Sequence, residues 1–248
     1  MNDNRESAVV TGASGGIGCA IVEQLASEKY NVWALVHHKN EEIEKTFDQV
    51  AKKNEVEIEI VEVEFLNMDL ISDAIKAIIK SDKNISVLVN NAGMPYDKTL
   101  SLTSMVDLEK TLRVNFVIPS YIIQLVSRVM IKNRKGYIVN IISRAAMEVR
   151  SGTYAYGSSK AALAWGTRAT AKELAAYNIR VNGIAPGLTE TKMGTLRRSE
   201  ESVQRYVQIN NIKRPARPEE IANVVSFLIS DKSSYISGQI ISVDGGRM

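Results

Sequence analysis

The chain has 248 residues, of which 45% are hydrophobic and 24% charged, and its 31 basic and 28 acidic residues give a formal net charge of +3. A chain of this size buries an apolar core without disulfides or a structural metal, and its single cysteine, Cys19, points to a reducing compartment. The small basic excess argues against nucleic acid, Met1–Ser7 shows no secretory signal, and no apolar run approaches the roughly 20 residues that span a bilayer. We therefore expect a cytoplasmic protein that binds neither nucleic acid nor membrane.

Short β-branched apolar runs alternate along the chain with longer segments of helical period. Such alternation favours a parallel sheet with helices on both faces, and right-handed connections make it doubly wound. We predict a single-domain α/β Rossmann fold over residues 1–248. Strands are expected at Ser7–Thr11, Asn31–His37, Val56–Val63, Val87–Asn90, Gly136–Ile142, Ile179–Ile184 and Gln239–Val243, and helices near 17–28, 41–53, 69–80, 104–132, 153–176 and 218–229.

The most irregular stretch, residues 188–217, is rich in charge and has little strand character. We interpret it as a lid with a short helix near 200–209, because long loops in compact domains are usually functional. The alternative is a variable surface excursion.

A glycine-rich turn joins the first expected strand to the first expected helix. Glycines at such a turn allow a tight bend and bring backbone N–H groups close to a pyrophosphate at the helix N-terminus. The spacing differs from G-x-G-x-x-G, so a tight turn that binds nothing is the alternative. The predicted dinucleotide contacts are Gly12, Ser14, Gly15, Gly16, Ile17 and Gly18.

The second expected strand ends in His37, His38, Lys39 and Asn40, with no acidic residue before Glu41. An acid at this position holds the ribose hydroxyls of NAD, whereas basic or small polar residues accommodate a 2′-phosphate. We therefore predict NADP(H) rather than NAD(H), with both histidines near the ribose. We expect no metal site, because adjacent strand residues point to opposite faces and no third ligand is evident.

The fourth expected strand ends in Asn90-Asn91-Ala92-Gly93. Short polar and small residues there let the backbone approach a ligand in the crevice at the carboxyl edge of the sheet. A plain turn is the alternative.

Tyr156 and Lys160 lie one helical turn apart at the start of an expected helix. The spacing places both on one face, where the ammonium is expected to lower the tyrosine pKa from about 10, so that the phenol exchanges a proton near neutral pH. Ser143 ends the fifth expected strand and reaches the same crevice, where its hydroxyl can hold a carbonyl oxygen. A solvated helix face is the alternative for the tyrosine–lysine pair alone.

Together these motifs resemble the short-chain dehydrogenase/reductase family. The resemblance runs from residue 7 to the end of the chain and implies a seven-stranded Rossmann sheet with a catalytic tetrad of Asn115, Ser143, Tyr156 and Lys160. The motifs are Thr11-Gly12-x3-Gly16-Ile17-Gly18, Asn90-Asn91-Ala92-Gly93, Asn115, Ser143, Tyr156-x3-Lys160, Pro186-Gly187, Tyr235-Ile236-Ser237-Gly238-Gln239 and Val243-Asp244-Gly245-Gly246.

The resemblance also implies a role for each tetrad residue. Tyr156 protonates the carbonyl oxygen as hydride arrives from the nicotinamide, while Ser143 holds that oxygen. Lys160 lowers the tyrosine pKa and binds the nicotinamide ribose, and Asn115 anchors a water that resupplies the proton.

Further cofactor contacts are implied in three places. Glu64 and Phe65 stand near the adenine, where many relatives have an acidic or amide residue followed by Val or Leu. Gly15 stands where NADP-dependent relatives often carry a basic residue. The remaining contacts are Asn91, Ala92 and Gly93, and, toward the carboxamide and phosphates, Pro186, Gly187, Thr189 and Thr191.

Within the family the chain is most similar to bacterial 3-oxoacyl-acyl-carrier-protein reductases, which implies a 3-oxoacyl thioester on acyl carrier protein or CoA. Arg134 matches one carrier-docking position, Tyr177 occupies the second, and Arg144 and Arg150 are candidates to meet a small anionic substrate instead. Substitute basic residues are Arg168, Lys172, Arg197, Arg198, Lys213, Arg214 and Arg217.

Two other functions stay open. One is reduction of another small ketone, sugar or steroid; the other is a non-catalytic NADP(H)-binding scaffold, because fold alone does not prove activity. Family relatives commonly form tetramers through the helices near 104–132 and 153–176, so a homotetramer is expected. Leu163, Trp165 and Leu174 are candidates for either that interface or the core.

Overall fold

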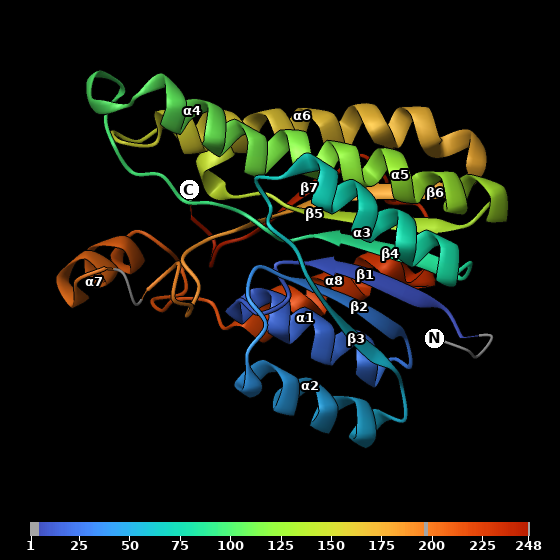
Figure 1. Ribbon diagram of the computed structural model, residues 1–248. Helices are drawn as coiled ribbons and strands as arrows, with labels where there is room; N and C mark the ends of the chain where they lie inside the picture. The colour runs from blue at the N-terminus through green and yellow to red at the C-terminus, as the bar shows by residue number, and fades with distance from the viewer. Residues whose placement is uncertain (1–4, 196–197, 248) are drawn as a thin grey trace.

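The computed structural model describes residues 5–195 and 198–247 and has a three-layer α/β architecture (Figure 1). All strand neighbours pair in parallel, in the order β3-β2-β1-β4-β5-β6-β7. The predicted doubly wound Rossmann fold is therefore confirmed. The strands are β1 (Ser7–Thr11), β2 (Asn31–Val36), β3 (Ile58–Glu62), β4 (Ile85–Asn90), β5 (Gly136–Ile141), β6 (Ile179–Pro186) and β7 (Ile240–Val243).

Helices cover both faces of the sheet (Figure 1). The central strands β1 and β4 are buried along their whole length, as expected of parallel strands packed on both sides. One face carries α1 (Gly16–Ser27), α2 (Glu41–Asn54) and α8 (Pro218–Ile229) over one apolar cluster. The other carries α3 (Met68–Ser81), α4 (Met105–Leu112), α5 (Ile118–Asn133) and α6 (Tyr154–Leu174), mainly over a second.

The helix expected near 104–132 contains one π-helical turn, Arg113–Val117, between α4 and α5. Its whole length, Met105–Asn133, is long and apolar enough to cross a bilayer by length and composition, so the expectation that no segment approaches this limit is wrong. Most of its apolar window is buried in the fold, because residues such as Ile118, Ile122 and Val126 pack into the core. Core packing therefore explains its hydropathy.

The register brings the strand ends into line at one edge of the sheet. Thr11 on β1 pairs with Asn90 on β4, which pairs with Asn140 on β5. The predicted site residues follow these ends, so the topology gathers them at one edge. The predicted short helix is α7 (Glu200–Gln208), which lies beyond that edge (Figure 1).

Candidate active site

The glycine turn is held against the segment after β4 by hydrogen bonds from both sides. The hydroxyl Oγ1 of Thr11 accepts from the backbone N–H groups of Asn91 and Ala92, each at 3.0 Å. The side-chain amide of Asn91 donates to the carbonyl of Gly12 at 2.9 Å. Gly12 has φ +65°, and a Cβ there would lie 2.8 Å from Ala92 Cα, so glycine is required for this approach.

The N-terminus of α1 is open in a way that fits a pyrophosphate. Its N-cap, Gly15, makes no side-chain cap hydrogen bond, and its first turn has no acidic residue. By contrast, α2 and α3 are capped by Asn40 and Asn67. Uncapped N–H groups at a helix N-terminus attract anions, and Ser14, Gly15 and Gly16 are exposed here.

Gly18 and Ile17 have packing roles in this turn. Gly18 is buried, and a Cβ there would lie 2.2 Å from the carbonyl oxygen of Gly12. Ile17 packs against the core cluster under α1. Gly18 and Ile17, both predicted to contact the dinucleotide, therefore support the shape of the turn through packing.

The segment after β6 approaches the same helix end. Gly187 donates its N–H to Val243 at 2.9 Å, which ties the Pro186 end of β6 to β7. Thr189 is buried and forms a bridge with Ala216. Thr191 reaches α1, because a Cβ on Gly16 would lie 2.7 Å from its methyl group.

The predicted adenosine end carries acids as well as histidines. The rings of His37 and His38 lie 4.0 Å apart, and Nδ1 of His37 is 3.8 Å from a carboxylate oxygen of Glu64. Glu62, which the sequence analysis missed, accepts from the backbone N–H of Lys39 at 2.7 Å.

Phe65 does not present its ring to this end. The side chain is only 7% exposed and packs in the core cluster under α3 and α5. The core therefore holds the ring, and the contact of Phe65 with the cofactor stays a prediction.

Asn115 is buried in the π-helical turn and is fully engaged. Its Oδ1 accepts from the N–H of Met94 at 2.7 Å, and its Nδ2 donates to Met94 O and to Ser159 Oγ, both at 2.9 Å. Ser159 in turn donates to the carbonyl of Tyr156 at 2.7 Å. Asn115 is therefore not a helix-surface amide, and Ser159 is a further candidate site residue that lies inside the Tyr-x3-Lys motif.

Ser143 and Tyr156 come together because α6 begins against the loop after β5. A Cβ on Gly157 would lie 2.8 Å from the carbonyl of Ala145, so glycine allows this approach. The phenol interacts with the Ser143 hydroxyl, which lowers the tyrosine pKa, but desolvation of the phenol outweighs it and raises that pKa. Asp97 raises and Arg150 lowers the same pKa through their charges.

Lys160 is almost fully buried beneath Gly93 and donates from Nζ to the carbonyl of Ile141 at 2.8 Å. Burial lowers the pKa of its ammonium to about 8. The expectation that Lys160 lowers the pKa of Tyr156 is wrong for this conformation, because the net direction for the phenol is upward and its lowering influences come from Ser143 and Arg150.

A cleft of about 500 Å³ lies at the carboxyl side of the sheet, next to helix α7. It lies between the loop after β4, with Pro95 and Asp97, and the 188–217 segment. The charge of Asp97 acts on the Tyr156 phenol, so one residue of the cleft lining lies within electrostatic range of the phenol. The residues that line it from the 188–217 segment are Met193, Arg198, Ser199 and Ser202.

Comparisons with known proteins show what this chain is similar to. A family model described as enoyl-(acyl carrier protein) reductase matches residues 12–247. The 3-oxoacyl-[acyl-carrier-protein] reductase FabG of Aquifex aeolicus (strain VF5) is 40% identical over 238 residues, 96% of this chain and 95% of the relative. Acetoacetyl-CoA reductase of Acinetobacter sp. (strain RA3849) is 34% identical over 239 residues, 96% of each chain. The structure of 7α-hydroxysteroid dehydrogenase with NADH and 7-oxo glycochenodeoxycholic acid has a TM-score of 0.90 at 30% identity, covering 98% of this chain and 94% of that chain.

The fold, the site and these relatives define an oxidoreductase that acts on CH–OH and C=O groups. The chain belongs to the short-chain dehydrogenase/reductase family. Proteins of this family use NAD(H) or NADP(H).

Proposed function

We propose that this protein reduces the 3-keto group of a 3-oxoacyl thioester with NADPH, and that Tyr156 donates the proton. The observation that carries the proposal is that Tyr156 interacts with Ser143 while Lys160, one helical turn further along α6, lies buried under Gly93 of the loop that contacts the glycine turn. When bound, the nicotinamide supplies the hydride. The side chains supply position and the proton.

Each catalytic side chain has a state suited to this role. Burial raises the pKa of Tyr156, so the phenol keeps its proton at neutral pH and can give it to a carbonyl oxygen. The Ser143 hydroxyl, already beside the phenol, holds the same oxygen. Burial lowers the pKa of the Lys160 ammonium to about 8, so this group can release a proton near neutral pH and bind a ribose hydroxyl. Asn115 fixes the loop after β4 to α6 through Met94 and Ser159.

NADP(H) is the proposed cofactor because His37, His38 and Lys39 follow β2. Glu64 lies close to His37, and Lys39 pairs with Glu44 at 2.8 Å, so part of this basic charge is neutralised. A structural relative was solved with NADH, which keeps NAD(H) as the alternative. His38, exposed beside His37, has no acidic partner among the described contacts and is the group offered to a 2′-phosphate.

The thioester assignment is supported by the names of two relatives, which act on acyl-carrier-protein and CoA substrates. Arg134, proposed for carrier docking, is exposed and donates from Nη2 to the carbonyl of Ala176 at 3.0 Å. Arg214 and Arg217 both contact Glu220, so they contribute less free charge than the sequence suggests. Arg197, another candidate, lies outside the described residues.

The test is NADPH oxidation with acetoacetyl-CoA and acetoacetyl-acyl carrier protein, set beside a panel of free ketones, sugars and steroid ketones. We expect kcat/KM to be higher for the thioesters than for the free ketones. A higher value for one of the free ketones would select the second candidate, which the likeness to a hydroxysteroid dehydrogenase favours. Absence of turnover on every substrate, with tight NADPH binding, would favour the non-catalytic scaffold.

Binding of the two reduced cofactors is measured separately, by fluorescence titration without substrate. We expect NADPH to bind more tightly than NADH. Tighter binding of NADH would show that Glu62 and Glu64 dominate over the histidines at the adenosine end.

We further propose that residues 1–248 form one domain that works in the cytoplasm as a homotetramer. Leu163 and Leu174 are buried within the chain, whereas Trp165 on α6 is 73% exposed and available for an interface. The relatives match nearly their whole length to this chain, which is consistent with one domain.

A further inference from the structure

Three segments that are distant in the sequence meet in a cluster of charged side chains. They are the loop after β5, the end of the described chain after β7, and helix α7. We call this the arginine cluster, and its members are Arg144, Glu148, Arg150, Asp244 and Arg247, with the ring of Tyr206 against it.

Glu148 is the central acid of the arginine cluster. One of its oxygens accepts from Nη2 of Arg247 at 2.5 Å and lies 4.0 Å from Nε of Arg150. Its other oxygen lies 3.9 Å from Nη2 of Arg144. Asp244 contacts Nε of Arg144 at 3.0 Å and is 9% exposed. Arg144 and Arg150, expected as candidates for an anionic substrate, are therefore already engaged with protein acids.

The arginine cluster holds α7 through one aromatic ring. The guanidinium of Arg247 lies 4.2 Å from the centroid of Tyr206, and that of Arg150 lies 5.4 Å from it. Both distances are within the range of attractive cation–π contacts. Arg247 is buried, with 9% of its surface exposed, so this contact is largely shielded from water.

Tyr206 lies one helical turn after Ser202, which lines the cleft together with Ser199. The face of α7 that closes the cleft is therefore anchored by the next turn of the same helix. At the other end of the contact, Arg150 belongs to the loop that begins at Ser143. The charge of Arg150 also acts on the phenol of Tyr156.

We propose that Tyr206 and Arg247 form a latch that holds α7 against the Ser143 loop through Glu148 and Arg150, and so sets the width of the substrate cleft. Tyr206, Arg247 and Glu148 are then positioning residues for carbonyl reduction, since they act through the cleft wall and the Ser143 loop. The latch rests on the proposed site, but its mechanical part does not depend on which substrate is reduced.

One buried group in the closed latch favours its opening. Nη1 of Arg247 is buried and has no hydrogen-bond partner among the described residues. A buried donor without a partner disfavours the state that buries it, so the closed latch gives up part of the stability that its contacts provide. Opening of α7 would break the contacts of Arg247 and Arg150 with the Tyr206 ring.

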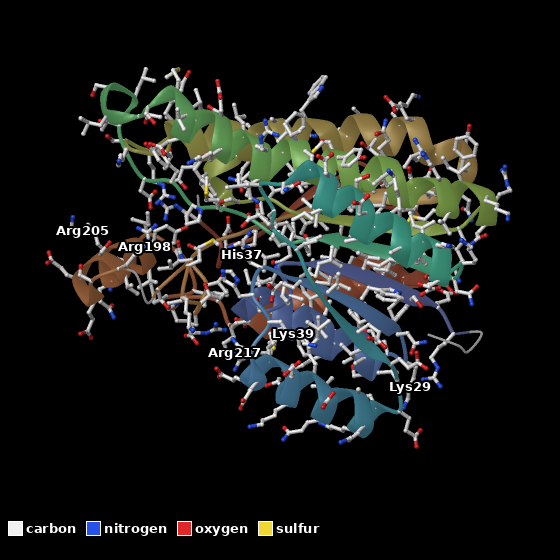
Figure 2. All side chains as sticks on the ribbon, viewed as in Figure 1. Lys29, His37, Lys39, Arg198, Arg205 and Arg217 are labelled. Carbon is white, nitrogen blue, oxygen red and sulfur yellow. The ribbon has the colours of Figure 1, made fainter. Side chains whose placement is uncertain are left out.

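The first test compares Tyr206→Leu, which removes the ring, with Tyr206→Phe, which keeps it. Gln204→Ala, on the exposed side of α7, is the matched control. Limited trypsin digestion of the free enzyme reports opening, because Arg198 and Arg205 are exposed on this segment (Figure 2). We expect Tyr206→Leu to be cut about three- to thirtyfold faster than the wild type, with Tyr206→Phe and Gln204→Ala close to it. Equal cutting of Tyr206→Leu and Gln204→Ala would overturn the latch.

The second test is a double-mutant cycle with Arg247→Met, which keeps side-chain length and removes the charge. If the two residues act as one latch, the double variant is cut no faster than the faster single variant. Additive effects would show two independent contacts and overturn the proposal.

Steady-state kinetics on the best substrate then separate positioning from chemistry. We expect Tyr206→Leu to raise the substrate KM by about three- to thirtyfold, the factor expected for the digestion rate. The NADPH dissociation constant and the thermal midpoint should be unchanged within error. A fall in thermal midpoint with no change in KM would mean a purely structural contact. If no substrate turns over, the proposed function fails while the digestion result still decides the latch.

Discussion

Burial changes the proton chemistry of Tyr156 and Lys160 in opposite directions. Desolvation disfavours a phenolate and an ammonium alike, so it raises the pKa of the tyrosine and lowers that of the lysine. The spacing of these residues predicted that they share a helix face. The spacing could not predict how far each side chain is buried, and burial determines the direction in which each pKa moves.

Tyr156→Phe tests the proton donor at the level of a single atom. The substitution removes the hydroxyl and keeps the ring, so we expect kcat for carbonyl reduction to fall by about 10²–10⁴-fold. The NADPH dissociation constant, measured by fluorescence, should stay near the wild-type value. Wild-type turnover in this variant would assign the proton to another group.

The pH profile of kcat/KM tests Lys160. In this profile the ionisations of the free enzyme appear. The ammonium of Lys160 titrates at a pKa of about 8, and the pKa of Tyr156 is raised, so the phenol stays protonated across that range. We expect reduction to lose efficiency as pH rises through about 8, where Lys160 loses its proton. A profile that stays flat to pH 10 would contradict a proton supply through Lys160.

At the scale of elements, α6 is joined to the π-helical turn by one buried hydroxyl. Ser159 accepts from Asn115 and donates to the carbonyl of Tyr156, whereas its neighbour Ser158 is exposed. Sequence reasoning missed Ser159 because a serine in a helix has the same pattern whether it faces solvent or another helix. Asn115 was identified by resemblance, but its partners depend on the π-helical turn, which no sequence period indicated.

Ser159→Ala tests this joint, with Ser158→Ala as its control. The variant removes one acceptor from Asn115 and one donor to Tyr156, which costs about 1–3 kcal/mol of unfolding free energy. We expect kcat to fall about tenfold, because a small displacement of the phenol weakens catalysis strongly. Ser158→Ala should match the wild type in both measurements, chemical denaturation and steady-state kinetics. Equal behaviour of the two variants would exclude a positioning role for Ser159.

The glycine turn offers a second test at this scale, because the space around Gly18 is much tighter than the space around Gly15. A Cβ at Gly18 would lie 2.2 Å from the carbonyl of Gly12, whereas a Cβ at Gly15 would lie 3.5 Å from the same oxygen. We expect Gly18→Ala to lower stability by about 1–3 kcal/mol, and Gly15→Ala to keep the thermal midpoint of the wild type. Differential scanning calorimetry without cofactor decides this. Equal midpoints for both variants would mean that the turn relaxes around a new methyl group.

For the whole molecule, strand order and hydrophobic pattern predicted the sheet and the edge where the site forms. Each of the seven strands was placed within two residues at both ends, and the central strands carry the continuous β-branched runs of buried parallel strands. The acids at the adenosine end were missed in part, since Glu62 reaches Lys39 across neighbouring strands. Such contacts depend on the register between neighbouring strands, which a linear sequence motif does not specify.

Assembly is tested through the exposed indole of Trp165. This side chain on α6 is 73% exposed, and Val117 and Tyr154, on the same layer of helices, are also exposed (Figure 1). If these helices form the proposed interface, Trp165→Arg places a charge in it and we expect a smaller species by light scattering with size-exclusion chromatography. An unchanged mass would place the interface elsewhere, or show that the wild type is monomeric.

The π-helical turn has a consequence for deletions. A π turn accommodates one more residue than an α-helical turn, so removing a single residue from Arg113–Val117 would let this segment wind as ordinary α-helix. The helices on either side would keep their rotational phase, and α5 would still present its apolar stripe to the sheet. Such a shortened chain would keep the packing of this helix layer on the sheet but shift the carboxamide of Asn115 relative to Met94 and Ser159, so the same deletion would disturb the site more than the core.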